Sequence, residues 1–203
     1  TNDGTRTSDQ TLQAQGQTGR ESVLPVASTV VLARDGADGP EVLLIERPDR
    51  GSFAGAWVVP GGKLDPEDAD GFDVEPSELD VARRAGVREV WEETGLVTDE
   101  TGYATLSCWI PPAIVTHRRI RTWFFVALAP EGELSLSPDE AVAARWIRPA
   151  DALALHANNG LSLFPPTWVT LEGLVGFVDA AAMVAATREA APREFMSRSP
   201  ARR

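Results

Sequence analysis

Residues 88–95, REVWEETG, place three glutamates within five positions. On a helix, Glu89, Glu92 and Glu93 stand at i, i+3 and i+4 and therefore share one face. Like charges at this spacing destabilise a helix, and the macrodipole disfavours negative charge near its C-terminus. Such a local cost often marks a functional site. A divalent cation would relieve it, and hard oxygen ligands suit Mg²⁺ or Mn²⁺. The alternative is a solvated acidic helix surface, the usual fate of a run of charges.

The residues around this segment predict a helix from Glu78 to Thr94. Ser77 and Asp80 form the pattern of a capping box, and Gly95 suits the position just after the last turn. Arg88 stands beside the carboxylates and could hold one of them by a charge-assisted hydrogen bond. Small residues on the acidic face would let another backbone approach closely: Ala82, Ala85 and Gly86. The far face would supply the core contacts through Leu79, Val87, Val90 and Trp91.

The rest of the chain predicts a mixed α and β domain between two tails. Apolar, β-branched runs bounded by Gly, Pro and Asp predict strands. They cover residues 28–34, 41–47, 56–60, 105–110, 121–129 and 143–147. Residues 63–76 are acidic and lack periodicity, which favours a loop. A short helix is expected at 151–159 and a longer one at about 167–188. Residues 1–22 are expected to be a disordered tail and residues 189–203 a flexible basic tail.

Composition narrows the class of protein further. The chain has 203 residues with 43% hydrophobic content, which suits one domain with tails. Its formal charge of −11 makes non-specific nucleic-acid binding unfavourable. Cys108 is the one cysteine and sits in an apolar run, so it is expected to be a buried thiol. Because the N-terminus is polar and no apolar run has the length of a membrane helix, we expect a cytoplasmic protein without a membrane segment.

The acidic segment resembles the signature of the Nudix hydrolases, G-x5-E-x7-R-E-U-x-E-E-x-G-U. The second half matches at Arg88, Glu89, Val90, Glu92, Glu93, Gly95 and Leu96. Counting back from Arg88 places the signature glutamate on Asp80 and its glycine on Val74. The glycine that fits is Gly62, and an insertion of 12 residues in the loop before the helix would explain both facts. The capping role of Asp80 explains that residue equally well. The resemblance covers about residues 26–150.

The resemblance implies an α/β/α sandwich, the Nudix fold, with a mixed central sheet and a C-terminal helix over residues 23–188. It implies Mg²⁺- or Mn²⁺-dependent hydrolysis of a nucleoside diphosphate linked to another moiety. It also makes a homodimer a candidate assembly. Glu92 and Glu93 would be the firmest metal ligands, and Glu89 would be a ligand or the base that orients water. Glu140, from a later loop, is a candidate base or an ordinary loop acid. The turn at Gly62 would let the backbone approach the metal, or is a plain tight turn.

For the substrate, the loop insertion and the segments PPAIVTHRRIRTWFFVALAP and LFPPTWVTLEGL resemble the acyl-coenzyme A diphosphatase branch. In that branch basic residues precede the TWFF strand. Here they are His117, Arg118, Arg119 and Arg121, which would bind phosphate or form a solvated turn. Arg47 and Gly55 match part of an upstream coenzyme A motif. Trp57 and Trp123 would stack a base or fill the core.

Other substrates stay open in the sequence. ADP-ribose, nucleotide sugars and dinucleotides are the alternatives, followed by a ligand-binding domain without catalysis. A hydrolase acting on nucleic acid is disfavoured by the net charge.

Overall fold

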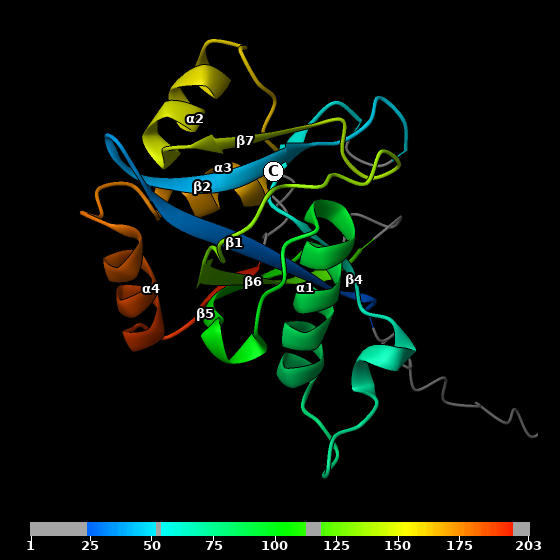
Figure 1. The fold of residues 1–203 in the computed structure, drawn as a ribbon. Coiled ribbons are helices and arrows are strands. Elements are labelled where there is room, and N and C mark those ends of the chain that lie inside the picture. The colour runs from blue at the N-terminus through cyan, green and yellow to red at the C-terminus, as the bar shows by residue number, and fades with distance from the viewer. Residues whose placement is uncertain (1–23, 52–53, 113–118, 197–203) are drawn as a thin grey trace, which may run out of the picture.

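The computed structural model describes residues 24–51, 54–112 and 119–196. Its centre is one mixed sheet (Figure 1). The strands are β1 (Val26–Gly36), β2 (Gly39–Glu46), β3 (Trp57–Val58), β4 (Gly61–Lys63), β5 (Ala104–Ile110), β6 (Arg121–Leu128), β7 (Ala143–Ile147) and β8 (Arg193–Met196). The order along the sheet is β3-β2-β1-β6-β5-β8, while β4 pairs with β1 and β7 pairs with β2. The β1–β6 and β5–β8 pairs are parallel and the other pairs are antiparallel.

Helices cover both faces of this sheet and enclose two apolar cores. Helix α1 (Glu78–Thr94) covers one face and contributes Ala82 and Val90 to the core beneath it. On the other face, a larger core receives side chains from α2 (Pro149–Ala157), α3 (Pro165–Glu172) and α4 (Ala180–Glu189). The predicted α/β/α sandwich with a mixed sheet is therefore confirmed.

Helix α1 lies against β1 because its contact stripe is made of small residues. A Cβ atom added to Gly86 would lie 2.8 Å from both Ser28 Oγ and Val30 Cγ2, so only glycine permits this approach. The predicted close contact at the small residues is confirmed. The prediction that Trp91 lies in the core is wrong, because its exposed fraction is 58%. The buried stripe centres on Ala82, Gly86 and Val90, and Trp91 lies about 100° further around the helix.

The long helix predicted at 167–188 is instead two helices. Helix α3 ends at Glu172, and α4 begins at Ala180 after a turn that includes Gly176 with φ of 92°. The N-terminus of α4 is capped by Asp179 and by Asp35 of β1, whose carboxylate accepts from Ala180 N at 2.7 Å. The apolar periodicity misled the prediction because two of its members lie in the turn and are exposed, Val175 (46%) and Val178 (81%).

Two segments predicted to lack regular structure contain short elements. Within residues 63–76, Pro66–Ala69 form one turn of 3₁₀ helix. The segment predicted to be a flexible tail from residue 189 includes β8, which pairs in parallel with β5, and Phe195 stacks on Trp109. Across residues 24–51, 54–112 and 119–196, no helix is long and apolar enough to cross a bilayer.

Candidate functional site

The ends of α1 fix the position of its acidic face. At its start, Ser77 and Asp80 form the predicted capping box, with Asp80 N donating to Ser77 Oγ at 3.2 Å and Ser77 N donating to Asp80 Oδ2 at 3.2 Å. At its end, Gly95 adopts the left-handed conformation with φ of 72°. The loop before β7 then satisfies the final turn, because Ser137 N donates to the carbonyl of Glu93 at 3.2 Å.

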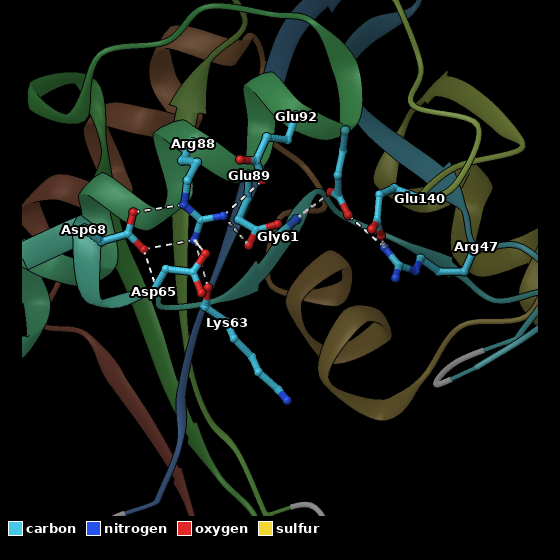
Figure 2. A network of polar contacts seen from close by, with 10 residues as sticks. Arg47, Gly61, Lys63, Asp65, Asp68, Arg88, Glu89, Glu92 and Glu140 are labelled. Atoms are coloured by element: carbon cyan, nitrogen blue, oxygen red, sulfur yellow. Dashed lines mark hydrogen bonds and ion pairs between the residues drawn. The ribbon is translucent and has the colours of Figure 1, made fainter.

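Arg88 is the centre of the first part of the polar network (Figure 2). Its Nη1 donates to Glu89 Oε1 at 2.9 Å and to Glu92 Oε2 at 3.0 Å. Its Nε and Nη2 make a paired contact with Asp68, at 3.0 and 2.9 Å, and Nη2 also donates to the carbonyl of Lys63 at 2.9 Å. One guanidinium therefore orients two of the three signature glutamates, as the sequence led us to expect of Arg88.

Asp68 is a site residue that the sequence reasoning missed, and it corrects the placement of the insertion. Asp68 is 4% exposed and also accepts from Asp65 N at 2.8 Å. It stands six positions after Gly62, which matches the G-x5-E spacing with Asp in place of Glu. The insertion therefore follows the acid, because 19 residues separate Asp68 from Arg88 where the signature has seven. Counting forward from Gly62 could have found it, whereas counting back from Arg88 led to Asp80, a capping residue.

Glu93 is the buried member of the acidic face. Its residue exposure is 2%, yet both carboxylate oxygens have a donor. Oε2 accepts from Gly61 N at 2.8 Å, and Oε1 accepts from Arg47 Nη1 at 2.8 Å. These donors come from β4 and from the residue after β2, so the sheet edge holds the carboxylate of a helix residue.

Glu140 joins this second part of the network through the same arginine. Arg47 Nη1 lies 2.9 Å from Glu140 Oε2, and Figure 2 shows the two side chains pointing toward one another. The side chain of Glu140 is 46% exposed, against 3% for Glu93. The structure thus brings the later-loop acid predicted from the sequence next to a buried signature glutamate.

The glycine turn has one clear structural role. A Cβ atom on Gly62 would lie 2.3 Å from Glu89 Oε1, so any other residue would displace that carboxylate. Gly61, with φ of 156°, contributes the N–H that binds Glu93, and its own Cβ would lie 2.2 Å from the carbonyl of Ser28. The predicted backbone approach at this turn therefore serves the two carboxylates directly.

Burial dominates the electrostatics of the site. It raises the pKa of Glu93 to about 8, although the Gly61 N–H and the charge of Arg47 oppose the rise. Burial also raises the pKa of Glu89, against the lowering effect of Arg88. The hydrogen bond from Arg88 to Asp68 pushes the pKa of the guanidinium still higher than usual, so Arg88 stays charged. The site thus holds more carboxylate than its own arginines stabilise in the ionised form.

The donor set fits a hard divalent cation in its chemistry. Carboxylate oxygens from Glu89, Glu92 and Glu93 are the ligands that Mg²⁺ and Mn²⁺ prefer. In the described part of the chain, no three Asp, Glu, His or Cys side chains are gathered closely enough to hold a metal ion as they stand. The guanidinium groups of Arg88 and Arg47 lie against these oxygens.

The two described members of the predicted basic cluster, Arg119 and Arg121, have partners away from the acidic face. Arg121 makes a paired contact with Glu78, the first residue of α1, at 3.1 and 3.0 Å. Glu78 and Glu93 are separated by about 22 Å along the helix axis. Arg119 donates to the carbonyl of Pro111 at 3.0 and 3.2 Å. His117 and Arg118 lie outside the described residues.

The other singled-out residues have structural surroundings. Trp57 is half-buried against the larger core, and the indole N–H of Trp123 donates to Glu78 at 2.9 Å. Cys108 is buried as expected, and burial raises the pKa of its thiol to about 11. None of these three contributes a contact to the network around Arg88 and Glu93.

Comparison with known proteins agrees with the fold and the motif. The NUDIX domain family matches residues 23–165. A NUDIX hydrolase structure from Alicyclobacillus acidocaldarius is similar with a TM-score of 0.70 and 22% identity, covering 81% of this chain and 97% of that chain. A MutT NUDIX hydrolase from Burkholderia pseudomallei has a TM-score of 0.54 and 27% identity, covering 74% and 97%.

A third similar structure is the NUDIX domain of Shewanella oneidensis NrtR complexed with ADP ribose. It has a TM-score of 0.57 and 18% identity, covering 78% of this chain and 91% of that chain. Among curated protein sequences, none matches significantly.

Proposed function

Because this chain belongs to the Nudix family and is a pyrophosphate hydrolase of that family, we propose that it cleaves the diphosphate linkage of a nucleoside diphosphate derivative with Mg²⁺ or Mn²⁺. The observation that carries the proposal is the buried carboxylate of Glu93, which shares Arg47 with Glu140 while Arg88 holds Glu89 and Glu92 of the same helix face. Carboxylates cost stability when they are buried at a helix C-terminus, so their retention here calls for a cation.

The charge of the substrate requires the same cation. A diphosphate is anionic and would be repelled by an acidic helix face in a protein of net charge −11. A divalent ion held by Glu89, Glu92 and Glu93 would reverse the sign of the local charge. When bound, it supplies polarisation of phosphorus and a more acidic attacking water.

The chain's own residues would divide the remaining tasks. Glu92, Glu93 and Glu89 would hold the cation, with the backbone at Gly62 beside them. Arg88, fixed by Asp68, keeps Glu89 and Glu92 in orientation. We assign the proton-accepting role to Glu140, because its half-exposed carboxylate lies next to the buried site and can reach a water molecule.

Glu140→Gln tests that assignment against metal binding. Removal of a general base should lower kcat by about 100- to 10,000-fold while Mn²⁺ affinity stays near wild type. Glu89→Gln is the matched comparison, since Glu89 is the other candidate base. If Glu140→Gln loses Mn²⁺ affinity in step with kcat, Glu140 is a ligand and the base lies elsewhere.

Two substrate classes deserve direct comparison. Coenzyme A or acyl-coenzyme A is the candidate from the sequence resemblance, with Arg47, Arg118, Arg119 and Arg121 as proposed phosphate contacts. Among the described members of this set, which exclude Arg118, Arg47 lies in the carboxylate network. ADP-ribose is the second candidate, supported by the NUDIX domain of NrtR that was determined with that ligand.

A product-resolved panel decides between them. Purified protein would be incubated with Mg²⁺ or Mn²⁺ and with coenzyme A, acyl-coenzyme A, ADP-ribose, a nucleotide sugar and a dinucleoside polyphosphate, with products identified by mass. Release of a phosphopantetheine from coenzyme A supports the first candidate, and release of AMP from ADP-ribose supports the second. Turnover that persists unchanged in EDTA would overturn the metal dependence. No turnover with any compound would favour a ligand-binding role.

A further inference from the structure

Arg47 places its positive charge between two carboxylates of the proposed cation site, those of Glu93 and Glu140. Its Nη1 contacts Glu93 Oε1 at 2.8 Å and Glu140 Oε2 at 2.9 Å, so one nitrogen bridges two carboxylates from different elements. The other oxygen of Glu93 is taken by the Gly61 N–H. A cation that binds Glu93 would therefore share its oxygens with the Gly61 N–H and with Arg47, and of these two donors Arg47 carries a competing positive charge.

The two arginines of the network are anchored very differently. Arg88 makes a paired contact with buried Asp68 and a hydrogen bond to the carbonyl of Lys63, besides its contacts to the glutamates. Within the described residues, the guanidinium of Arg47 has Glu93 and Glu140 as its side-chain partners and no backbone acceptor. Arg88 can therefore stay in place if Glu89 and Glu92 bind a metal ion, because Asp68 and the Lys63 carbonyl still hold it. Among the described residues, the guanidinium of Arg47 is instead held by Glu93 and Glu140, which are themselves the proposed metal ligand and base.

The backbone around Arg47 would not need to move in such an exchange. Arg47 N donates to the carbonyl of Ala56 at 2.9 Å, and its own carbonyl accepts from Gly55 N at 3.2 Å. On the other side, the loop carrying Glu140 is tied to α1 by Ser137 N and to β2 by Val142 N, which donates to the carbonyl of Glu46 at 2.9 Å. The side chain of Arg47 is 26% exposed, so its guanidinium can rotate toward solvent.

We propose that Arg47 is a built-in counter-ion of Glu93 and Glu140, and that a divalent cation binds by displacing its guanidinium from Glu93. This inference rests on the proposed function, because it assigns a role in cation binding to the same carboxylates. Like charges repel, so the guanidinium and the cation compete for Glu93. The displaced guanidinium stays tethered at the end of β2, beside the site, where it can bind a substrate phosphate. Arg47 thus opposes metal binding and then favours substrate binding.

Mn²⁺ binding without substrate tests the competition. Affinity would be measured by electron paramagnetic resonance of free Mn²⁺ for the wild type, Arg47→Met and Arg47→Lys. Arg47→Met should bind Mn²⁺ roughly tenfold more tightly, because a charge-assisted hydrogen bond no longer has to be broken. Arg47→Lys keeps the charge and should stay close to wild type. In steady-state assays, Arg47→Met should raise KM for the substrate identified by the panel.

Arg50→Met is the matched control. It removes the same charge three residues away, from an exposed pair with Asp139 in which the side chains are 65% and 88% exposed. Its Mn²⁺ affinity should change less than about twofold, because exposed charges are screened. Thermal melts in EDTA and in Mn²⁺ would establish that each variant folds, and the Mn²⁺-induced rise in Tm should be largest for Arg47→Met.

The outcomes separate the inference from the proposed function. Wild-type affinity or weaker binding in folded Arg47→Met would overturn the inference and leave the metal site intact. Tighter binding in both Arg47→Met and Arg50→Met by the same factor would also overturn it, because net charge would then explain the change. A wild-type protein that binds no Mn²⁺ would overturn the metal site itself, and the inference with it.

Discussion

The two ends of α1 both carry acidic side chains next to arginines, but the surroundings act on them in opposite directions. At the N-terminal end, hydrogen bonds from Ser77 lower the pKa of Asp80. At the C-terminal end, burial raises the pKa of Glu93 to about 8 and raises that of Glu89. The macrodipole favours negative charge at the first end and disfavours it at the second. An acidic side chain therefore stabilises the fold at the N-terminal end of α1 and costs stability at the C-terminal end.

The two ends of α1 also differ in how many donor side chains serve each carboxylate. Glu78, at the start of α1, receives two bonds from Arg121 and one from the indole of Trp123, so one acid has two donor side chains. Near the end of α1, the single guanidinium of Arg88 forms ion pairs with four carboxylates, Asp65, Asp68, Glu89 and Glu92. At the first end, both oxygens of Glu78 accept hydrogen bonds from within the protein. The second leaves negative charge that a bound cation would neutralise, which is why we assign function to that end.

The largest expected effect comes from neutralising the buried acid at the functional end. Glu93→Gln should lower kcat by at least about a hundredfold, because loss of a metal ligand removes several kcal/mol of transition-state stabilisation. Its Tm in EDTA should not fall below that of the wild type, because burial raises the pKa of Glu93 and thus disfavours its ionised form in the folded protein. Steady-state kinetics and calorimetry on the same sample provide both values.

Asp80→Asn is the contrasting variant at the structural end. It should lower Tm and leave kcat close to wild type, since it weakens the capping box and lies far from the acidic face. The comparison between the two ends would be wrong if Glu93→Gln were active, or if Asp80→Asn lost activity while still folded.

The next effect distinguishes Asp68 from Asp80, the two aspartates that the motif spacing can place at the position of the signature glutamate. Asp68→Asn should weaken Mn²⁺ binding by about 10- to 100-fold, because groups that orient metal ligands typically contribute that much. The mechanism is loss of the paired contact that holds Arg88 against Glu89 and Glu92. Asp80→Asn, measured in the same titration, should bind Mn²⁺ like the wild type. An equal loss in both variants would contradict the assignment of Asp68.

Those two aspartates also show what the sequence can and cannot supply. The helix 78–94 was predicted with both caps, because a capping box, a helical glycine stop and an acidic face are local patterns. The glutamates and Arg88 followed from the same local spacing. Asp68 did not, because its partner is 20 positions away and a loop of irregular length lies between them. A motif interrupted by an insertion can be counted from either end, and only the fold decides which count holds.

Contacts between segments that are far apart in the sequence explain the other differences between the predictions and the structure. Glu140 was predicted as a later-loop acid, but its bridge to Glu93 through Arg47 depends on three segments meeting. Arg121 was expected near the phosphates and instead lies against Glu78 at the other end of α1. The split between α3 and α4 depends on the Asp35 carboxylate from β1, which periodicity along the chain cannot reveal.

A smaller effect tests the structural end alone. Ser77→Ala removes the hydroxyl that accepts from Asp80 N. Loss of an N-cap side chain costs about 1 kcal/mol, which for a domain of this size lowers Tm by about 2–4 °C. Activity per folded molecule should be unchanged, as measured below the transition. A loss of kcat in this variant would mean that the two ends of α1 are coupled. It would contradict the assignment of stability to the N-terminal end and of function to the C-terminal end.

The smallest effect is the pH dependence of the Asp80 contribution. Its folded-state pKa lies below the ordinary value of 3.8 because of the bonds from Ser77. The charged form is therefore favoured by folding, and its stabilisation is fully present above that ordinary value and disappears as pH falls through the lowered one. Asn at position 80 does not ionise, so the difference in urea midpoint between the wild type and Asp80→Asn should be greatest near neutral pH and shrink below pH 3.8. A difference that stays constant with pH would assign the role of Asp80 to the geometry of the capping box and not to its charge. The electrostatic part of the contrast between the two helix ends would then rest on the burial of Glu93 and Glu89.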